Sequence, residues 1–147
     1  MKKLLILLLL IPTLIQAEEF NLVCEGEELY TFDSRDGWKD KKIIVVKVRE
    51  ESIRIENSTY STQKKNNSAG NFESLYTKDT DLITVFLTNI HPPKKNNCQR
   101  ADFTASIDRV SGLIKTESRI TDKCRGKKWF MGKIYEGRCK KQKGNAF

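Results

Sequence analysis

Apolar and polar residues alternate with a period of two through most of the chain. The clearest case is the segment 101–108, in which Ala101, Phe103, Ala105 and Ile107 alternate with polar residues. This alternation is typical of a β-strand that has one face on a core and the other in water. No segment repeats its apolar residues convincingly at helical spacing. The pattern therefore predicts an all-β protein.

Polar turn segments separate the alternating stretches and fix the approximate number of strands. Strands are predicted at 20–24, 29–32, 43–49, 52–57, 72–77, 82–88, 101–108, 114–120 and 129–139. The segment 29–32 either continues the strand at 20–24 or forms a strand of its own, so we expect about eight strands. Loops are predicted at 33–40, 63–71 and 89–97. Short strands with regular turns predict a small antiparallel barrel or sandwich.

One hairpin can be placed in register. Pairing Ile107 with Ile114 and Phe103 with Ser118 puts the apolar residues of both strands on one face. The connection is then the four-residue loop Arg109–Gly112, a length that usually contains a type I turn. This register is used below to predict a disulfide.

The first seventeen residues have a different pattern. Lys2 and Lys3 precede the apolar run Leu4–Ile11, which is the layout of a secretory signal peptide. The run is shorter than the roughly 20 apolar residues that a membrane-spanning helix needs. We therefore predict a signal peptide at 1–17 and a single exported domain at 18–147, located in the periplasm or secreted.

All four cysteines lie in the predicted mature domain. An even number in a small exported protein predicts two disulfides. Extending the hairpin outward brings Cys98 near Cys124, one residue out of register, which a bulge can absorb. Cys24 and Cys139 remain, on the first and last strands. The main alternative joins Cys24 to Cys98 and Cys124 to Cys139.

Positive charge is concentrated near the C-terminus. The formal net charge is +8, and the segment 113–147 has eleven Lys/Arg against three Asp/Glu, whereas 18–112 has fourteen against sixteen. This asymmetry indicates either contact with an anionic partner or a basic surface that keeps the protein soluble.

A basic cluster with interspersed aromatic residues lies around the last predicted strand. In an exported protein its partners would be anionic envelope polymers, lipid head groups or acidic proteins rather than nucleic acid. The alternative places the aromatic residues in the core and the lysines in water. The residues 140–147 are expected to form a frayed tail. The predicted binding residues are Lys127, Lys128, Arg138, Lys140 and Lys141.

The sequence contains no recognisable catalytic arrangement. His91 is the only histidine, and no nucleophile motif accompanies it. Asp33, Asp36 and Asp40 lie close together, but their spacing does not fit a calcium loop. We therefore predict a binding protein without enzymatic activity, metal or cofactor.

Two resemblances add to this interpretation. The segment 103–139, with IDRVSG at Ile107–Gly112 and YEGRCK at Tyr135–Lys140, resembles uncharacterised small exported bacterial proteins that carry an ID-R-x-[ST]-G turn and a final G-x-C-K. That resemblance implies a fold and an exported location, and no activity.

The second resemblance is to periplasmic inhibitors of c-type lysozyme. In those barrels an inhibitory loop carries a serine-glycine signature followed by an aromatic residue, and Ser68–Phe72 is similar to it. The resemblance implies an inhibitor that acts through the segment 63–72, which is the alternative function. Charge opposes it, because such lysozymes are strongly basic and two positive proteins repel.

Overall fold

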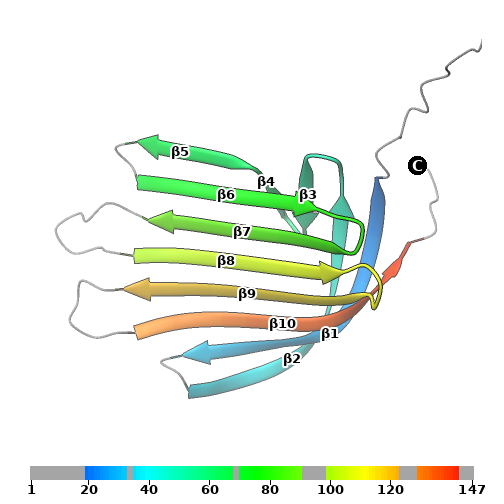
Figure 1. Ribbon diagram of the computed structural model, residues 1–147. Helices are drawn as coiled ribbons and strands as arrows, with labels where there is room; N and C mark the ends of the chain where they lie inside the picture. The colour runs from blue at the N-terminus through cyan, green and yellow to red at the C-terminus, as the bar shows by residue number, and fades with distance from the viewer. Residues whose placement is uncertain (1–18, 33–34, 68–69, 91–98, 123–128, 143–147) are drawn as a thin grey trace, which may run out of the picture.

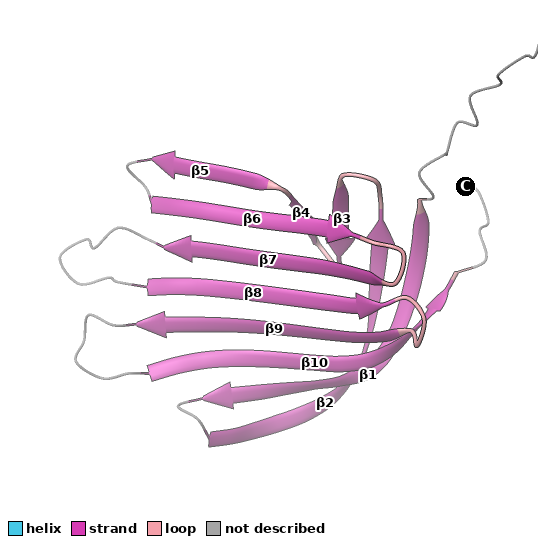
Figure 2. Ribbon diagram, viewed as in Figure 1, coloured by secondary structure: helices cyan, strands magenta, loops and turns pink. Residues whose placement is uncertain are grey.

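The computed structural model describes residues 19–32, 35–67, 70–90, 99–122 and 129–142, which form ten strands of one antiparallel sheet (Figures 1 and 2). The strands are β1 (Phe20–Phe32), β2 (Arg35–Val48), β3 (Ser52–Ile55), β4 (Ser58–Ser61), β5 (Gln63–Asn67), β6 (Gly70–Lys78), β7 (Leu82–Ile90), β8 (Gln99–Asp108), β9 (Leu113–Asp122) and β10 (Trp129–Lys141). In this part of the chain we find no helix suited to crossing a membrane.

The sheet curls into a nearly closed barrel. Its strand order is β4-β3-β2-β1-β10-β9-β8-β7-β6-β5, so strands that pair are neighbours in sequence except for β1 and β10. The two strands at the ends of this order, β4 and β5, follow one another directly in the chain. The barrel therefore closes where the backbone bends between them, at Thr62.

The Thr62 side chain completes this junction. Its hydroxyl donates a hydrogen bond to the carbonyl oxygen of Tyr76 at 3.1 Å and accepts one from the Tyr76 N–H at 3.2 Å. The Thr62 side chain thus pairs with both the N–H and the C=O of Tyr76 on β6. It takes the place that a neighbouring strand would otherwise have there.

The predicted all-β antiparallel architecture is confirmed, but the count of about eight strands is wrong. Two segments predicted as loops are largely strand, because β2 begins at Arg35 and β5 occupies Gln63–Asn67. Each has a strand partner on only one side over these residues. An edge segment that does not face the core needs no apolar alternation, so the sequence pattern missed both.

The apolar core fills one end of the barrel, where β3 pairs with the last residues of β2 and β4 lies beside β6 (Figure 1). We call this the closed end. The opposite end, where β5 and the first part of β2 have one partner each, is called the open end. The side chains that are almost fully buried at the closed end are those of Cys24, Val46, Val48, Ile53, Ile83, Ile107 and Ile114.

The hairpin and one disulfide follow the prediction. Ile107 pairs with Ile114 and Phe103 with Ser118. Cys24 and Cys139 face each other directly on β1 and β10 and are joined by a disulfide, which excludes the alternative connectivity. The predicted partner pair, Cys98 and Cys124, lies outside the described residues, so the second disulfide stays a prediction.

Two glycines face each other on β1 and β10. Gly26 pairs with Gly137, and a Cβ on Gly26 would lie 2.1 Å from the carbonyl oxygen of Glu136. A Cβ on Gly137 would lie 2.6 Å from the Tyr135 hydroxyl oxygen. Only glycine fits at either position, because the β10 backbone blocks a side chain at Gly26 and the Tyr135 side chain blocks one at Gly137. This close packing lies at the boundary between the core and the polar interior described next.

Candidate functional site

The inner face of the barrel changes from apolar to polar along single strands. On β1 the buried Leu22 and Cys24 are followed by the buried Glu28. On β2 the corresponding change is from Ile44 to Lys42. Because alternate residues of a strand share one face, all five side chains point into the barrel. The interior therefore has an apolar half at the closed end and a polar half toward the open end.

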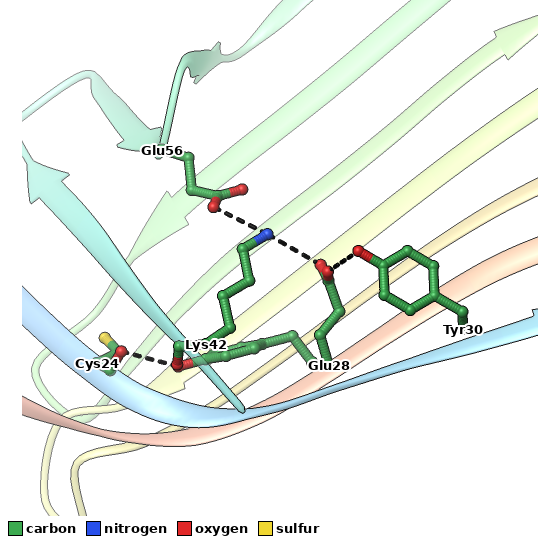
Figure 3. A network of polar contacts seen from close by, with 6 residues as sticks. Cys24, Glu28, Tyr30, Lys42 and Glu56 are labelled. Carbon is green, nitrogen blue, oxygen red and sulfur yellow. Dashed lines mark hydrogen bonds and ion pairs between the residues drawn. The ribbon is translucent and has the colours of Figure 1, made fainter. Parts of the chain in front are cut away.

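An ion-pair network occupies the polar half (Figure 3). The Lys42 ammonium lies 3.1 Å from Glu28 Oε1 and 3.0 Å from Glu56 Oε1. The Tyr30 hydroxyl donates a hydrogen bond to the other oxygen of Glu28. The Lys133 ammonium lies over the Tyr30 ring, 4.7 Å from its centroid. The network links β1, β2, β10 and the β3–β4 turn.

The network sets the protonation of its members. Burial disfavours the charged form of Glu28, but hydrogen bonds from Tyr30 and Lys42 outweigh it and lower the pKa of the carboxyl. Burial likewise opposes the charge on Lys42, whereas hydrogen bonds to Glu56 and Glu28 outweigh it and raise its pKa. Both groups are therefore held ionised at neutral pH.

Tyr135 joins the network to the core. Its hydroxyl donates to the Cys24 carbonyl oxygen at 2.9 Å and lies 3.5 Å from that of Lys42. Burial raises the pKa of Tyr135 to about 12. A cavity of about 280 Å³ opens beside these residues, and the stacked rings of Tyr60 and Phe103, with centroids 4.7 Å apart, form part of its wall.

The chemistry of this interior favours a structural role. A general acid near neutral pH needs a raised carboxyl pKa, and that of Glu28 is lowered. The two carboxylates and the ammonium of Lys42 also satisfy one another. Among the described residues, no group of three or more histidine, cysteine, aspartate or glutamate side chains is arranged to hold a metal ion.

The predicted binding residues do not form one face. Arg138 and Lys140 lie two residues apart on the outer face of β10, opposite Glu25 and Val23 of β1. Lys141 lies on the other face, where its ammonium is 5.4 Å from the centroid of the Phe20 ring. It is part of β10, as is Lys140, so the prediction of a frayed tail is wrong for these two residues. The residues 143–147 lie outside the described residues. Lys127 and Lys128 lie outside the described residues.

The sequence analysis missed a row of cations on β2. Its outward-facing residues are exposed and are, in order, Lys39, Lys41, Ile43, Val45 and Lys47. Ile43 is 65% exposed and Val45 42%. The alternation of these residues could have revealed the row, but the prediction of a loop at 33–40 split it in two.

The row on β2 and the two cations on β10 form one surface across β1, which we call the β2–β10 face. It consists of Lys39, Lys41, Ile43, Val45, Lys47, Arg138 and Lys140. Within the described part of the chain none of its five cations forms an ion pair. The intervening β1 contributes the exposed carboxylates Glu25 and Glu27. The face is thus net positive with an apolar centre.

A groove of about 500 Å³ borders this face on β1, β9 and β10. Leu29, Leu113 and Ile134 contribute apolar side chains to its lining, and Lys39 and Arg138 belong to both groove and face. The β2–β10 face and this groove make up the candidate binding surface.

In the segment proposed for an inhibitor, 63–72, the described residues belong to two paired strands, β5 and β6, instead of a loop. Gln63 pairs with Ser74 and Lys65 with Phe72, across β5 and β6. The described side chains of β5 are polar and exposed. His91 and the segment 68–69 lie outside the described residues.

Comparison of the chain with protein-family models, curated proteins and solved structures found no match.

Proposed function

We propose that this protein is an exported, non-enzymatic binding module that holds an anionic component of the cell envelope on its β2–β10 face. The observation that carries the proposal is the exposure of Ile43 and Val45 between lysines on one outward row of β2. Exposed apolar side chains with unpaired cations around them are typical of interaction surfaces.

The exported location is part of the same proposal. The residues 1–17 support it, and the disulfide between Cys24 and Cys139 is compatible with an oxidising compartment. The measurement is the mass and N-terminal sequence of the protein recovered from its native host. A mature chain that begins at Glu18 is expected, and a cytoplasmic chain that retains Met1 would contradict this part of the proposal.

The anion-binding part is tested with a pair of variants that lose equal charge. Lys41→Gln/Lys47→Gln removes two cations from the β2–β10 face, whereas Lys64→Gln/Lys65→Gln removes two from β5. We expect retention of polyglutamate and of anionic vesicles to fall several-fold in the first variant only, and to disappear for both probes at about 0.5 M salt. Equal losses in the two variants would show that total charge, and not this face, governs binding.

The hairpin β5–β6 supports a second candidate, a protein inhibitor of a hydrolase. Its specific observation is that the exposed side chains of β5 lie on an edge strand with one neighbour, so the hairpin is accessible to an enzyme cleft. The test is inhibition of c-type lysozyme by the mature protein. Absence of inhibition by the wild-type protein would end this candidate.

A further inference from the structure

Most of β2 has an unpaired edge. It pairs with β1 from Val48 to Lys39, but with β3 only over Val46–Val48. From Lys39 to Ile44 its second side has no strand partner among the described residues. A row of unpaired N–H and C=O groups along such an edge is a template for another strand.

One hydrogen bond shows which backbone groups point to this edge. The Glu56 N–H donates to the Val45 carbonyl oxygen at 3.0 Å, which lies on the side away from β1. In an antiparallel strand the N–H and C=O of one residue point the same way, and successive residues alternate. The pairing of β2 with β1 is regular from Val48 to Lys39. The N–H and C=O groups of Lys39, Lys41 and Ile43 therefore point outward along the edge.

The two strands at the ends of the sheet order, β4 and β5, are also edges, and they have a different character. β4 is only four residues long. β5 is five residues long, and every residue in it is polar. Short and polar edge strands are a common protection against unwanted pairing. The β2 edge is longer and carries Ile43, which is 65% exposed. Of these three edges, β2 is the one suited to accept a strand.

We propose that the β2 edge accepts an extended acidic segment of a partner protein as an additional strand. The segment would hydrogen-bond to Lys39, Lys41 and Ile43, and its outward side chains would lie beside the same three residues. Acidic side chains at alternate positions of the segment then lie beside Lys39 and Lys41 on the outer face, and the apolar residues between them lie on the other face of the strand. This inference rests on the proposed binding function and names the partner as an acidic polypeptide in extended conformation.

Charge argues against a second copy of this chain as the occupant. Antiparallel pairing of β2 with itself, centred on Lys41, would place that lysine opposite its own copy and bring all the lysines of both edges together. Like charges directly opposite one another destabilise a strand pair. The same lysines stabilise a strand of opposite charge, which is why an acidic partner fits.

The test uses a synthetic eight-residue peptide of alternating glutamate and valine, with an alternating lysine–valine peptide and polyglutamate as comparisons. Binding of the glutamate–valine peptide to the full mature protein is followed by NMR amide hydrogen exchange. The amides of Lys39, Lys41 and Ile43 are expected to gain protection on binding. Those of Asp40 and Lys42 already face β1 and are expected to change little.

Two substitutions at one position separate backbone pairing from charge. Lys41→Gln removes the charge and keeps the N–H, so the peptide should bind about 2- to 5-fold more weakly. Lys41→Pro also removes the outward N–H, which an edge strand tolerates when that group faces solvent. We expect a further loss of about tenfold or more. The exchange measurement on the wild-type protein decides the question if the proline variant fails to fold.

The outcomes distinguish this inference from the proposed function. If polyglutamate binds while the glutamate–valine peptide protects no amide and the two Lys41 variants bind it equally, strand addition is overturned and anion binding stands. If neither anionic probe binds, both proposals fail. Binding of the lysine–valine peptide as tight as that of the acidic peptide would also overturn the acidic partner.

Discussion

The two ends of the barrel use the same strands for different purposes. At the closed end β1 and β10 are joined by the disulfide, and Ile53, Ile83 and Ile107 are almost completely buried. At the open end the same strands carry the Glu28–Lys42 network, and the Lys42 side chain is still 29% exposed. Apolar burial and a covalent bond hold one end, whereas ion pairs hold the other.

This division explains how a small sheet can leave an edge unpaired. Buried apolar area supplies most of the stability of a domain, and partly exposed ion pairs add little. The closed end therefore fixes the barrel, so β2 can lack a second neighbour from Lys39 to Ile44 without loss of the fold.

The largest effect is expected from the disulfide. The chain-entropy relation gives about 4–5 kcal/mol for the 115-residue separation of Cys24 and Cys139. The variant Cys24→Ala/Cys139→Ala should lower the free energy of unfolding by about this amount, measured by urea denaturation. The same relation gives about 3–4 kcal/mol for the predicted Cys98–Cys124 pair. Equal stability of the wild-type protein with and without reductant would refute a stabilising role for both disulfides.

An intermediate effect is expected from the core of the closed end. Ile107 is 2% exposed and lies in the apolar cluster, so Ile107→Ala should cost about 3–4 kcal/mol through lost burial and a cavity. Leu75 is 48% exposed on β6, and Leu75→Ala should cost no more than about 0.5 kcal/mol. Thermal and urea unfolding of both variants measure the difference. A larger loss for Leu75→Ala would mean that the outer face carries the core contacts.

The smallest effect is expected from the ion-pair network. Glu28→Gln keeps the shape of the side chain and should cost about 1–2 kcal/mol at pH 7. Its neighbour Glu27 is exposed on the outer face, so Glu27→Gln is the matched control, with a change within about 0.5 kcal/mol.

The pH dependence of the Glu28 variant provides a second readout. Because the folded protein lowers the pKa of Glu28 below its ordinary value of 4.5, its contribution is fully present above that value. The contribution is lost as the pH falls through the lowered pKa. The difference in unfolding free energy between wild type and Glu28→Gln should therefore shrink in acid. A difference that stays constant down to pH 2 would show that the ionised carboxylate contributes nothing.

The sequence was sufficient for the parts of the fold that face the core. Strict alternation in 101–108 predicted β8 and its register with β9, because burial on one face determines which residues must be apolar. The disulfide between Cys24 and Cys139 followed from the position of the cysteines on the first and last strands. These features depend on local patterns or on simple pairing of elements.

The candidate binding surface could not be read in the same way. Lys39 falls in a segment whose aspartates and glycine are typical of a loop, and Lys41 follows that segment directly. Only pairing with Leu29 and Glu27 of β1 makes both residues part of a strand. Arg138 was predicted as a binding residue, but its cationic neighbours come from β2, almost a hundred residues earlier in the chain. Clustering of this kind is a property of the folded sheet, and charge statistics cannot supply it.

The pairing of β1 with β10 has a consequence for how the barrel assembles. Every other pairing in the sheet joins strands that follow one another in the chain, whereas this one joins the first strand to the last. All ten strands can form hairpin by hairpin, within β1–β4 and within β5–β10, at a low entropic cost of loop closure, but β1 is paired on both sides only after β10 has formed. We therefore expect the pairing of β1 with β10 to be the slow, topology-limited step of folding, and a chain truncated before Trp129 would leave both β1 and β9 with one unpaired side.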